Sequence, residues 1–295
     1  MTRSRVTDFL VTGAGGMLGR DLLAVLAALP DIKVTALARA DLDVTDAGAV
    51  KEAIAGHDVV LNAAAWTDVD GAETREAEAT AVNGDGVANL ARASAAAGAR
   101  LVHVSTDYVF GGTGFPDLSG GAGPTPYPED APTDPINAYG RSKLVGEQAV
   151  LAAGGFVVRT AWLYGAHGPN FVSTMLRLAG EREHLDVVDD QRGQPTWSYA
   201  LAERLVALSL ADAPAGVYHG TASGETTWYG LARAVFELSG LDPDRIRPTT
   251  SDKYPRPAPR PAFSVLGHAR WSLAGLPPMT DWKTMLTSYL GAGRV

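Results

Sequence analysis

The sequence predicts an α/β fold in which a doubly wound parallel sheet carries helices on both faces. Short apolar runs at residues 9–11, 33–37, 59–61 and 101–104 have the length of buried strands, and helical stretches separate them. A glycine-rich turn follows the first run, and polar residues follow the later ones. With 295 residues, the chain is long enough to bury such a sheet on both faces.

The composition is that of a cytoplasmic protein. The absence of cysteine excludes disulfides, thiolate nucleophiles and cysteine-ligated metals. The apolar run behind Arg3 and Arg5 is about five residues long and enters a glycine turn, so it predicts a strand and not a signal peptide. No run approaches the roughly 20 apolar residues of a membrane span. The net charge of −8 argues against a nucleic-acid surface.

The first predicted strand opens into a turn that is typical of dinucleotide binding. Glycines in this turn permit a tight bend, close approach of the backbone to a diphosphate, and close packing of the next helix, which we expect over residues 21–29. The free N–H groups at the start of that helix would meet the phosphates. The turn reads Thr12-Gly13-Ala14-Gly15-Gly16-Met17-Leu18-Gly19. It predicts a Rossmann-type sheet.

The end of the second predicted strand bears on the choice of cofactor. A carboxylate there would bind a ribose 2′-hydroxyl, whereas an arginine suits a 2′-phosphate. The strand ends at Arg39, which favours NADPH, with NADH and a ligand-free surface arginine as alternatives. Asp43 and Val44 stand where an adenine could be hydrogen-bonded and covered.

Polar and small residues follow the third and fourth strands. Asn62 precedes three alanines that leave room for a cofactor, and it could hold the loop or touch the ligand. Residues 76–97 predict one long helix, within which Asn83 is either exposed or a brace for the site. Thr106 and Asp107 follow the fourth strand, where an open parallel sheet collects its ligands.

Tyr139 and Lys143 are expected one turn apart on one face of a helix that starts behind Asp134-Pro135. Such a pair is common on solvent-exposed helix faces. Beside a cofactor and a hydroxyl, however, an ammonium one turn away would lower the pKa of the phenol and give an acid–base unit. Thr106 would supply that hydroxyl.

The remaining segments predict further strands, helices and two irregular stretches. We expect strands at residues 156–159 and 217–219, the latter rejoining the main sheet. Residues 196–199 should lead into a helix that runs through residue 210, and Thr226-Thr227 should cap a helix that runs through residue 238. Residues 111–135 form either a lid or a partly disordered loop. Residues 253–261 are rich in proline and basic, so they predict a linker, or the cations that a nucleotide diphosphate needs. The histidines lack the spacing of metal ligands, so we expect no metal.

The motifs together resemble the extended short-chain dehydrogenase/reductases, and within them the dTDP-4-dehydrorhamnose reductase family. The resemblance covers nearly the whole chain. Beyond the glycine turn and the Tyr139–Lys143 pair, it is carried by Asn62-Ala63-Ala64, Ser105-Thr106-Asp107-Tyr108-Val109-Phe110, Arg159-Thr160-Ala161-Trp162-Leu163-Tyr164-Gly165, Asp190-Gln191-Arg192-Gly193-Gln194-Pro195-Thr196, and Arg260-Pro261 with Ser264 and Leu266. Trp66 departs from the histidine or tyrosine that is common at its position.

The resemblance implies a role for each candidate residue. The catalytic residues would be Tyr139 as proton donor, Lys143 as its activator and nicotinamide-ribose ligand, and Thr106 on the substrate carbonyl. The cofactor would lie on the glycine turn (Gly13, Gly16, Met17, Leu18 and Gly19), at Arg39, Asp43 and Val44, and on Ala65, Trp66 and Thr67. The sugar nucleotide would contact Thr106, Asp107, Trp162 and Arg260.

The resemblance further implies two interleaved domains. Residues 1–164 with about 197–221 would form the dinucleotide-binding domain, and about 165–196 with 222–295 the smaller sugar-nucleotide-binding domain. The expected activity is NADPH-dependent reduction of the C4 ketone of a dTDP-4-keto-6-deoxy-hexose, above all dTDP-4-dehydro-L-rhamnose, by a monomer or homodimer. The alternatives are a 4-ketoreductase for another deoxysugar, an epimerase or dehydratase, and a non-catalytic regulatory subunit. Dehydratases carry an acid where this chain has Tyr108.

Overall fold

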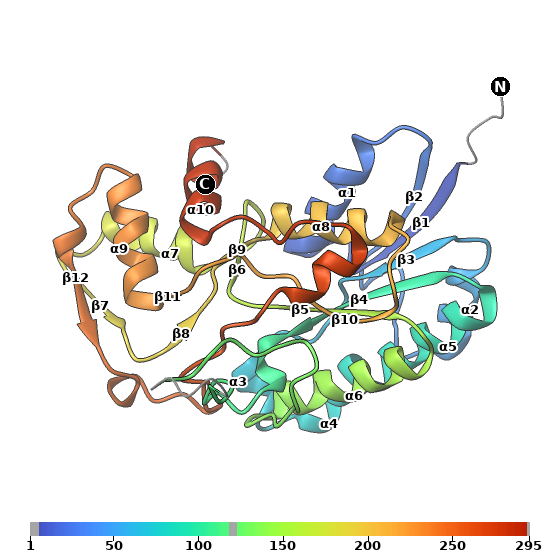
Figure 1. The fold of residues 1–295 in the computed structure, drawn as a ribbon, viewed down its shortest axis with the longest axis horizontal. Helices are drawn as coiled ribbons and strands as arrows, with labels where there is room; N and C mark the ends of the chain where they lie inside the picture. The colour runs from blue at the N-terminus through green and yellow to red at the C-terminus, as the bar shows by residue number, and fades with distance from the viewer. Residues whose placement is uncertain (1–5, 118–122, 294–295) are drawn as a thin grey trace.

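The computed structural model of the chain describes residues 6–117 and 123–293; Arg3, Arg5 and the middle of the 111–135 loop lie outside this range. Within it, a parallel sheet of six strands forms the centre, in the order β10-β5-β4-β3-β1-β2 (Figure 1). The predicted Rossmann-type fold is confirmed. The strands are β1 (Thr7–Thr12), β2 (Ile32–Leu37), β3 (Val59–Asn62), β4 (Arg100–Thr106), β5 (Phe156–Thr160) and β10 (Gly216–His219).

The strand order reverses at β1, which lies between β2 and β3. A crevice forms at such a switch point, beyond the carboxyl ends of the strands, and this is where doubly wound sheets bind ligands. The register aligns three polar residues across the neighbouring strands β1, β3 and β4: Thr12 lies opposite Asn62, and Asn62 lies opposite His103. The glycine turn after β1 and the candidate catalytic residue Thr106 at the end of β4 therefore lie at the same edge of the sheet, where the strands have their carboxyl ends.

Helices cover both faces of the sheet, as Figure 1 shows. One face carries α1 (Met17–Ala27) and α8 (Ser198–Leu210), which pack on each other and on the core around Phe9, Val11 and Val158. The other face carries α2 (Ala47–Ile54), α5 (Val87–Ala97) and α6 (Ala138–Ala152), which lie side by side. This arrangement buries most of β1, β3, β4 and β5 on both faces, which explains their continuous apolar runs, whereas the edge strand β2 stays partly exposed.

The helix predicted over residues 76–97 is not uniform. It runs as α4 (Glu76–Thr80), a π-helical turn η1 (Ala81–Gly86) and α5, after the short α3 (Val69–Ala72). At the turn the chain packs closely on α6, because a Cβ on Gly146 would lie 2.2 Å from the Asn83 carbonyl oxygen. A π-turn widens the helix locally, and such turns recur at functional sites. The predicted helix over residues 76–97 is thus confirmed, whereas composition gives no sign of the π-turn within it.

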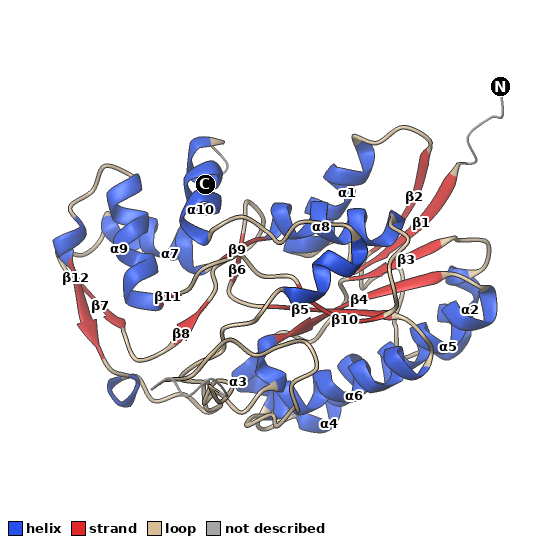
Figure 2. Ribbon diagram, viewed as in Figure 1, coloured by secondary structure: helices blue, strands red, loops and turns tan. Residues whose placement is uncertain are grey.

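The second part of the fold is made of short strand pairs and helices (Figure 2). It has its own apolar cluster, which includes Val172, Leu231 and Phe236. The elements are β6 (Leu163–Tyr164) with β9 (Thr196–Trp197), β7 (Leu185–Val188) with β12 (Ile246–Thr249), β8 (Arg192–Gly193) with β11 (Thr226–Thr227), and the helices α7 (Phe171–Ala179), α9 (Trp228–Leu238) and α10 (Trp282–Gly291). Over both parts of the described chain, the 3₁₀ turns are η2 (Asp107–Val109), η3 (Pro243–Arg245), η4 (Ser251–Lys253) and η5 (Ala269–Ala274).

The two parts share residues across the predicted domain boundaries. Trp271 and Met279 belong by number to the predicted sugar-nucleotide domain, yet they are buried in the apolar core of the main sheet. The division into two domains stays a prediction. The described residues of the 111–135 loop pair with a late segment of the chain, through bridges of Thr113 to Phe263 and of Tyr127 to Leu266.

Candidate active site

The glycine turn after β1 has the geometry that a diphosphate needs. Gly13 has a φ of 69°, and a Cβ there would lie 2.5 Å from the main-chain nitrogen of Ala64. A Cβ on Gly19 would lie 2.2 Å from the Gly13 carbonyl oxygen. Because α1 starts at Met17 with Gly16 as its N-cap, no side chain covers the first N–H groups. These residues could hold a dinucleotide diphosphate.

The other candidate cofactor residues differ in how they are placed. The side chains of Leu18 and Val44 are buried in the core, and the Val44 carbonyl accepts from Asn89 Nδ2 at 3.1 Å. Arg39 is exposed beyond the end of β2. The Asp43 carboxylate accepts from the main chain and hydroxyl of Thr45 at 2.9 and 2.8 Å, and these bonds lower its pKa.

The loop of Ala65, Trp66 and Thr67 is tied to the π-turn and reaches α6. Asn83 bonds both main-chain groups of Trp66 and donates to Ser142 Oγ at 3.0 Å. Of the two interpretations left open for Asn83, the brace is confirmed. Trp66 and Tyr139 pack against the same small cluster of alanines: Ala72, Ala79 and Ala138. The third strand's loop and the candidate proton donor therefore lie together.

Thr106 and Tyr139 meet at the carboxyl end of β4. Thr106 is close enough to lower the pKa of the Tyr139 phenol, and its Oγ1 donates to Asp107 Oδ1 at 3.1 Å. Burial raises the pKa of the Tyr139 phenol, and the charge of Asp107 adds to the rise, whereas the Thr106 hydrogen bond lowers it. The phenol is therefore protonated at neutral pH, as a proton donor must be.

Lys143 lies one turn after Tyr139 on α6, but its nitrogen turns to other partners. It is buried, donates to the Val104 carbonyl at 2.7 Å and lies 3.2 Å from His103 Nε2. Burial and Asp107 raise the pKa of Tyr139 overall, and the lowering effect expected of Lys143 itself stays a prediction. Burial lowers the pKa of Lys143 itself to about 8, against the opposing charge of Glu147.

Asp107 is buried beside these groups, and burial raises its pKa to about 6, although hydrogen bonds with Ser264 and Thr106 act in the opposite direction. Ser264 belongs to the segment that also contains Arg260. The carboxyl group is thus neutral or charged within the physiological range, next to the position where a substrate oxygen would be held.

Arg260 is linked to Tyr139 by the ring of Tyr108, which contacts both residues. The Tyr108 and Tyr139 rings meet edge to face with centroids 6.0 Å apart, and the Arg260 guanidinium lies 6.0 Å from the Tyr108 ring centroid. Asp70 of α3 anchors the same guanidinium at 3.0 Å and lies 3.9 Å from the more exposed Arg256. The basic segment is therefore fixed against the main-sheet part of the fold.

Trp162 lies at the junction with the second part. Its φ of 47° is unusual for a tryptophan, and its ring stacks on Trp228 with centroids 3.6 Å apart. A Cβ on Gly193 would lie 2.5 Å from the Trp162 ring, so the glycine permits this position. The stacked pair, with Gly193 packed against the Trp162 ring, forms an apolar platform at this junction.

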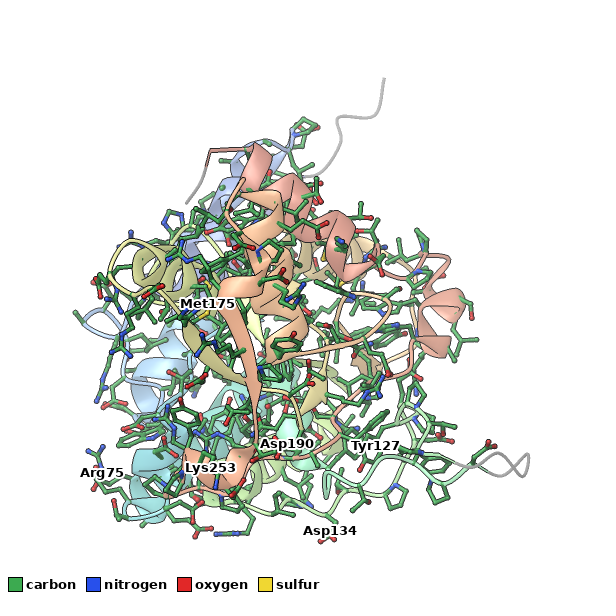
Figure 3. All side chains as sticks on the ribbon, turned by 90° about the vertical axis from the view of Figure 1, so that its left-hand side faces the viewer. Arg75, Tyr127, Asp134, Met175, Asp190 and Lys253 are labelled. Atoms are coloured by element: carbon green, nitrogen blue, oxygen red, sulfur yellow. The ribbon has the colours of Figure 1, made fainter. Side chains whose placement is uncertain are left out.

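The sequence analysis did not identify several residues that shape the candidate site. His103, Asp70 and Trp228 carry no motif, and only the register and the tertiary contacts reveal them. The stretch 190–196, which carries part of the family resemblance, makes structural contacts: Asp190 accepts from the main chain and hydroxyl of Ser251 at 2.8 and 2.6 Å. Figure 3 shows Asp190 and Lys253 at the end of the molecule that carries β7 and β12. In the part of the chain that the structure describes, no cluster of acidic or histidine side chains could hold a metal ion.

Comparison with known proteins gives a consistent result. The family model described as RmlD substrate binding domain matches residues 7–294. The dTDP-4-dehydrorhamnose reductase of Streptomyces griseus is 53% identical, over 95% of this chain and 91% of the relative. The dTDP-4-keto-6-deoxy-D-glucose reductase of Streptomyces niveus is 50% identical, over 96% of both chains. A solved dTDP-4-dehydrorhamnose reductase from Bacillus anthracis, in complex with NADP, is 34% identical with a TM-score of 0.87, over 97% of this chain and 99% of that one.

Proposed function

Because the chain belongs to the family of the RmlD substrate binding domain, we propose that it reduces the C4 ketone of a dTDP-4-keto-6-deoxy-hexose with NADPH. It is an NAD(P)H-dependent oxidoreductase of the extended short-chain dehydrogenase/reductase type. The substrate we favour is dTDP-4-dehydro-L-rhamnose, the sugar in the names of several relatives that are 47–53% identical.

One observation supports the chemistry most directly. A protonated phenol, Tyr139, and a hydroxyl, Thr106, lie together at the carboxyl end of the central sheet, where the glycine turn also opens. A ketone oxygen placed between them would accept from both. Donors aimed at an oxygen that gains negative charge stabilise the transition state of carbonyl reduction.

A bound NADPH would supply the hydride for C4 and would thereby be oxidised to NADP⁺. The chain's own residues manage the oxygen: Thr106 orients it, and Tyr139 transfers its phenolic proton to it, so that the C=O group becomes a C–OH group. General acid catalysis of this kind contributes about 10²–10⁴-fold to the rate. Gly13, Gly16 and Gly19 would hold the diphosphate, and Lys143 the nicotinamide ribose.

We assign the sugar nucleotide to the side of the site that faces the second part of the fold. Arg260 would meet the diphosphate, Asp107 a sugar hydroxyl, and Trp162 an apolar face. This assignment rests on the link from Tyr139 through Tyr108 to Arg260, and on the Trp162–Trp228 platform.

The substrate is tested by incubating the protein and NADPH separately with dTDP-4-dehydro-L-rhamnose and with dTDP-4-keto-6-deoxy-D-glucose. The proposal predicts stoichiometric oxidation of NADPH and a dTDP-L-rhamnose product with the first sugar. Faster turnover of the second sugar would instead favour the activity in the name of the Streptomyces niveus relative. Product formation without net NADPH consumption would instead indicate an epimerase.

We further propose that the protein works in the cytoplasm as a monomer or homodimer, without nucleic acid or membrane. The net charge of −8 is unfavourable for nucleic acid. The described residues contain no helix that is both long and apolar enough to cross a bilayer.

A further inference from the structure

Asn137, the residue before α6, is completely buried and connects two segments that lie far apart in the sequence. Its Oδ1 accepts the main-chain N–H of Gly140 at 2.8 Å, which caps the helix that carries Tyr139. Its Nδ2 donates to the Pro259 carbonyl at 3.0 Å, across 122 positions of the chain. Capping uses only the side-chain oxygen, so the contact of the amide nitrogen with Pro259 is additional to it.

The groups around Asn137 fix the orientation of its amide. A main-chain N–H can only donate and a carbonyl can only accept, so the amide oxygen must face Gly140 and the NH₂ group must face Pro259. An aspartate would still cap the helix, but an ionised carboxylate has no proton for the Pro259 carbonyl. A serine would also cap it, with a side chain that ends one atom earlier. The second contact therefore depends on the asparagine.

The segment that Asn137 holds carries the cation assigned to the sugar nucleotide. Pro259 directly precedes Arg260, whose guanidinium contacts Asp70 at 3.0 Å and the Ala258 carbonyl at 2.9 Å. Asp70 Oδ1 also accepts the main-chain N–H of Ala258 at 3.3 Å. These contacts orient the guanidinium, whereas Asn137 fixes the main chain from which it extends.

The start of α6 is fixed on the same group of residues. A Cβ on Gly140 would lie 2.1 Å from the Tyr108 carbonyl oxygen, so the first turn of the helix packs directly on the main chain of Tyr108. The Tyr108 ring in turn contacts the Tyr139 ring and the Arg260 guanidinium, each at 6.0 Å from its centroid. Asn137 closes this set of contacts, because it bonds the helix on one side and the segment of Arg260 on the other.

We propose that Asn137 is a positioning residue that sets the separation between the proton donor and the guanidinium that binds the substrate diphosphate. The ketone and the diphosphate belong to one substrate, so both can be bound only if Tyr139 and Arg260 are held at a matching separation. Asn137 needs no contact with the substrate for this role. The inference rests on the proposed function, because it concerns the substrate assigned there.

Asn137→Asp and Asn137→Ser test this role, since both keep a capping oxygen and remove the NH₂ group. Both variants should fold with nearly native helix content, which circular dichroism measures. With NADPH and dTDP-4-dehydro-L-rhamnose, the KM for the sugar nucleotide should rise about three- to tenfold, the effect of one hydrogen bond. The kcat should change less than the KM. The Kd for NADPH should stay within about a factor of two, because the glycine turn is untouched.

A double-variant cycle separates positioning from a general loss of structure. In Arg260→Ala the guanidinium that Asn137 positions is absent, so adding Asn137→Asp should raise the KM by less than about twofold. The control is Asp281→Ala, which removes the N-cap of α10 and should lower stability without raising the KM.

Two results would contradict the positioning role in a protein that turns over the sugar. One is an unchanged KM in both single variants at Asn137. The other is an equal rise in KM on adding Asn137→Asp to the native protein and to Arg260→Ala, since Asn137 would then act independently of the guanidinium. A native protein that oxidises no NADPH with any dTDP-4-keto sugar would instead overturn the proposed function, and this inference with it.

Discussion

Asn83 holds the main chain of Trp66 from both sides: its amide oxygen accepts the Trp66 N–H at 2.9 Å, and its amide nitrogen donates to the Trp66 carbonyl at 3.0 Å. Asn83 itself is completely buried, in the π-turn before α5. The loop assigned to the middle of the cofactor is thereby fixed to the same helix layer as Tyr139.

Replacing Asn83 by alanine should therefore affect both stability and cofactor binding. The two main-chain groups of Trp66 would lose their partners, so we expect the free energy of unfolding to fall by about 1–3 kcal/mol. NADPH affinity should fall as well, as measured by fluorescence titration. Glu78→Ala, on the exposed side of α4, is the control. Unchanged NADPH affinity in a folded Asn83→Ala protein would show that the Trp66 loop does not contribute to cofactor binding.

The sequence predicted the sheet and the glycine turn because local patterns determine them. Short apolar runs mark buried strands wherever they lie, and Gly13 is required by its own positive φ. Features that depend on contacts between distant segments have no such local pattern in the sequence. The π-turn around Asn83 and the anchoring of Arg260 by Asp70 arise from contacts between segments that are distant in the sequence.

The pKa of Tyr139 illustrates the same limit. The i, i+4 spacing from Lys143 suggested a lowered pKa, since a helix places the two residues on one face. Burial and Asp107 instead raise it, and the Lys143 amine turns to Val104 and His103. The spacing could identify the pair, but neither burial nor the other partners can be inferred from it.

Asp107 should make stability depend on pH. Folding raises the pKa of this carboxyl group from 3.8 to about 6, so the folded state binds the proton more tightly than the unfolded state. The native protein therefore loses stability as the pH rises from about 4 through about 6. The full cost of a shift of about two units is roughly 3 kcal/mol.

Asp107→Asn removes this cost. In urea unfolding, the stability of the variant relative to the native protein should be greater at about pH 8 than at about pH 4.5. A relative stability that does not change with pH would mean that the carboxyl group is not the buried titrating group described here.

Arg260 and Arg256 provide a matched pair for the sugar nucleotide. The Arg260 side chain is 20% exposed and lies over Tyr108, whereas that of Arg256 is 64% exposed. Arg260→Ala should raise the KM for the dTDP-sugar at least tenfold, since a charge-assisted hydrogen bond contributes about 1.5–3 kcal/mol. Arg256→Ala should change it little. Equal effects of the two variants in steady-state kinetics would argue for a general field of positive charge instead.

Arg39 is expected to select the cofactor. It is exposed beyond the end of β2, where a 2′-phosphate would lie. Arg39→Ala should weaken NADPH binding about tenfold and leave NADH binding nearly unchanged, because only NADPH carries the phosphate. Titration of both cofactors gives the ratio, and a parallel loss for both would assign Arg39 to the adenine or to structure.

The most direct test of the reductase assignment is Tyr139→Phe, assayed with NADPH and dTDP-4-dehydro-L-rhamnose. The ring and its contacts with Tyr108 and the alanine cluster remain, and only the proton donor is lost. We predict that kcat falls by about 10²–10⁴-fold while the Kd for NADPH stays within about a factor of two. Turnover close to that of the native protein would contradict the account, because the phenol could then not be the group that protonates the substrate oxygen.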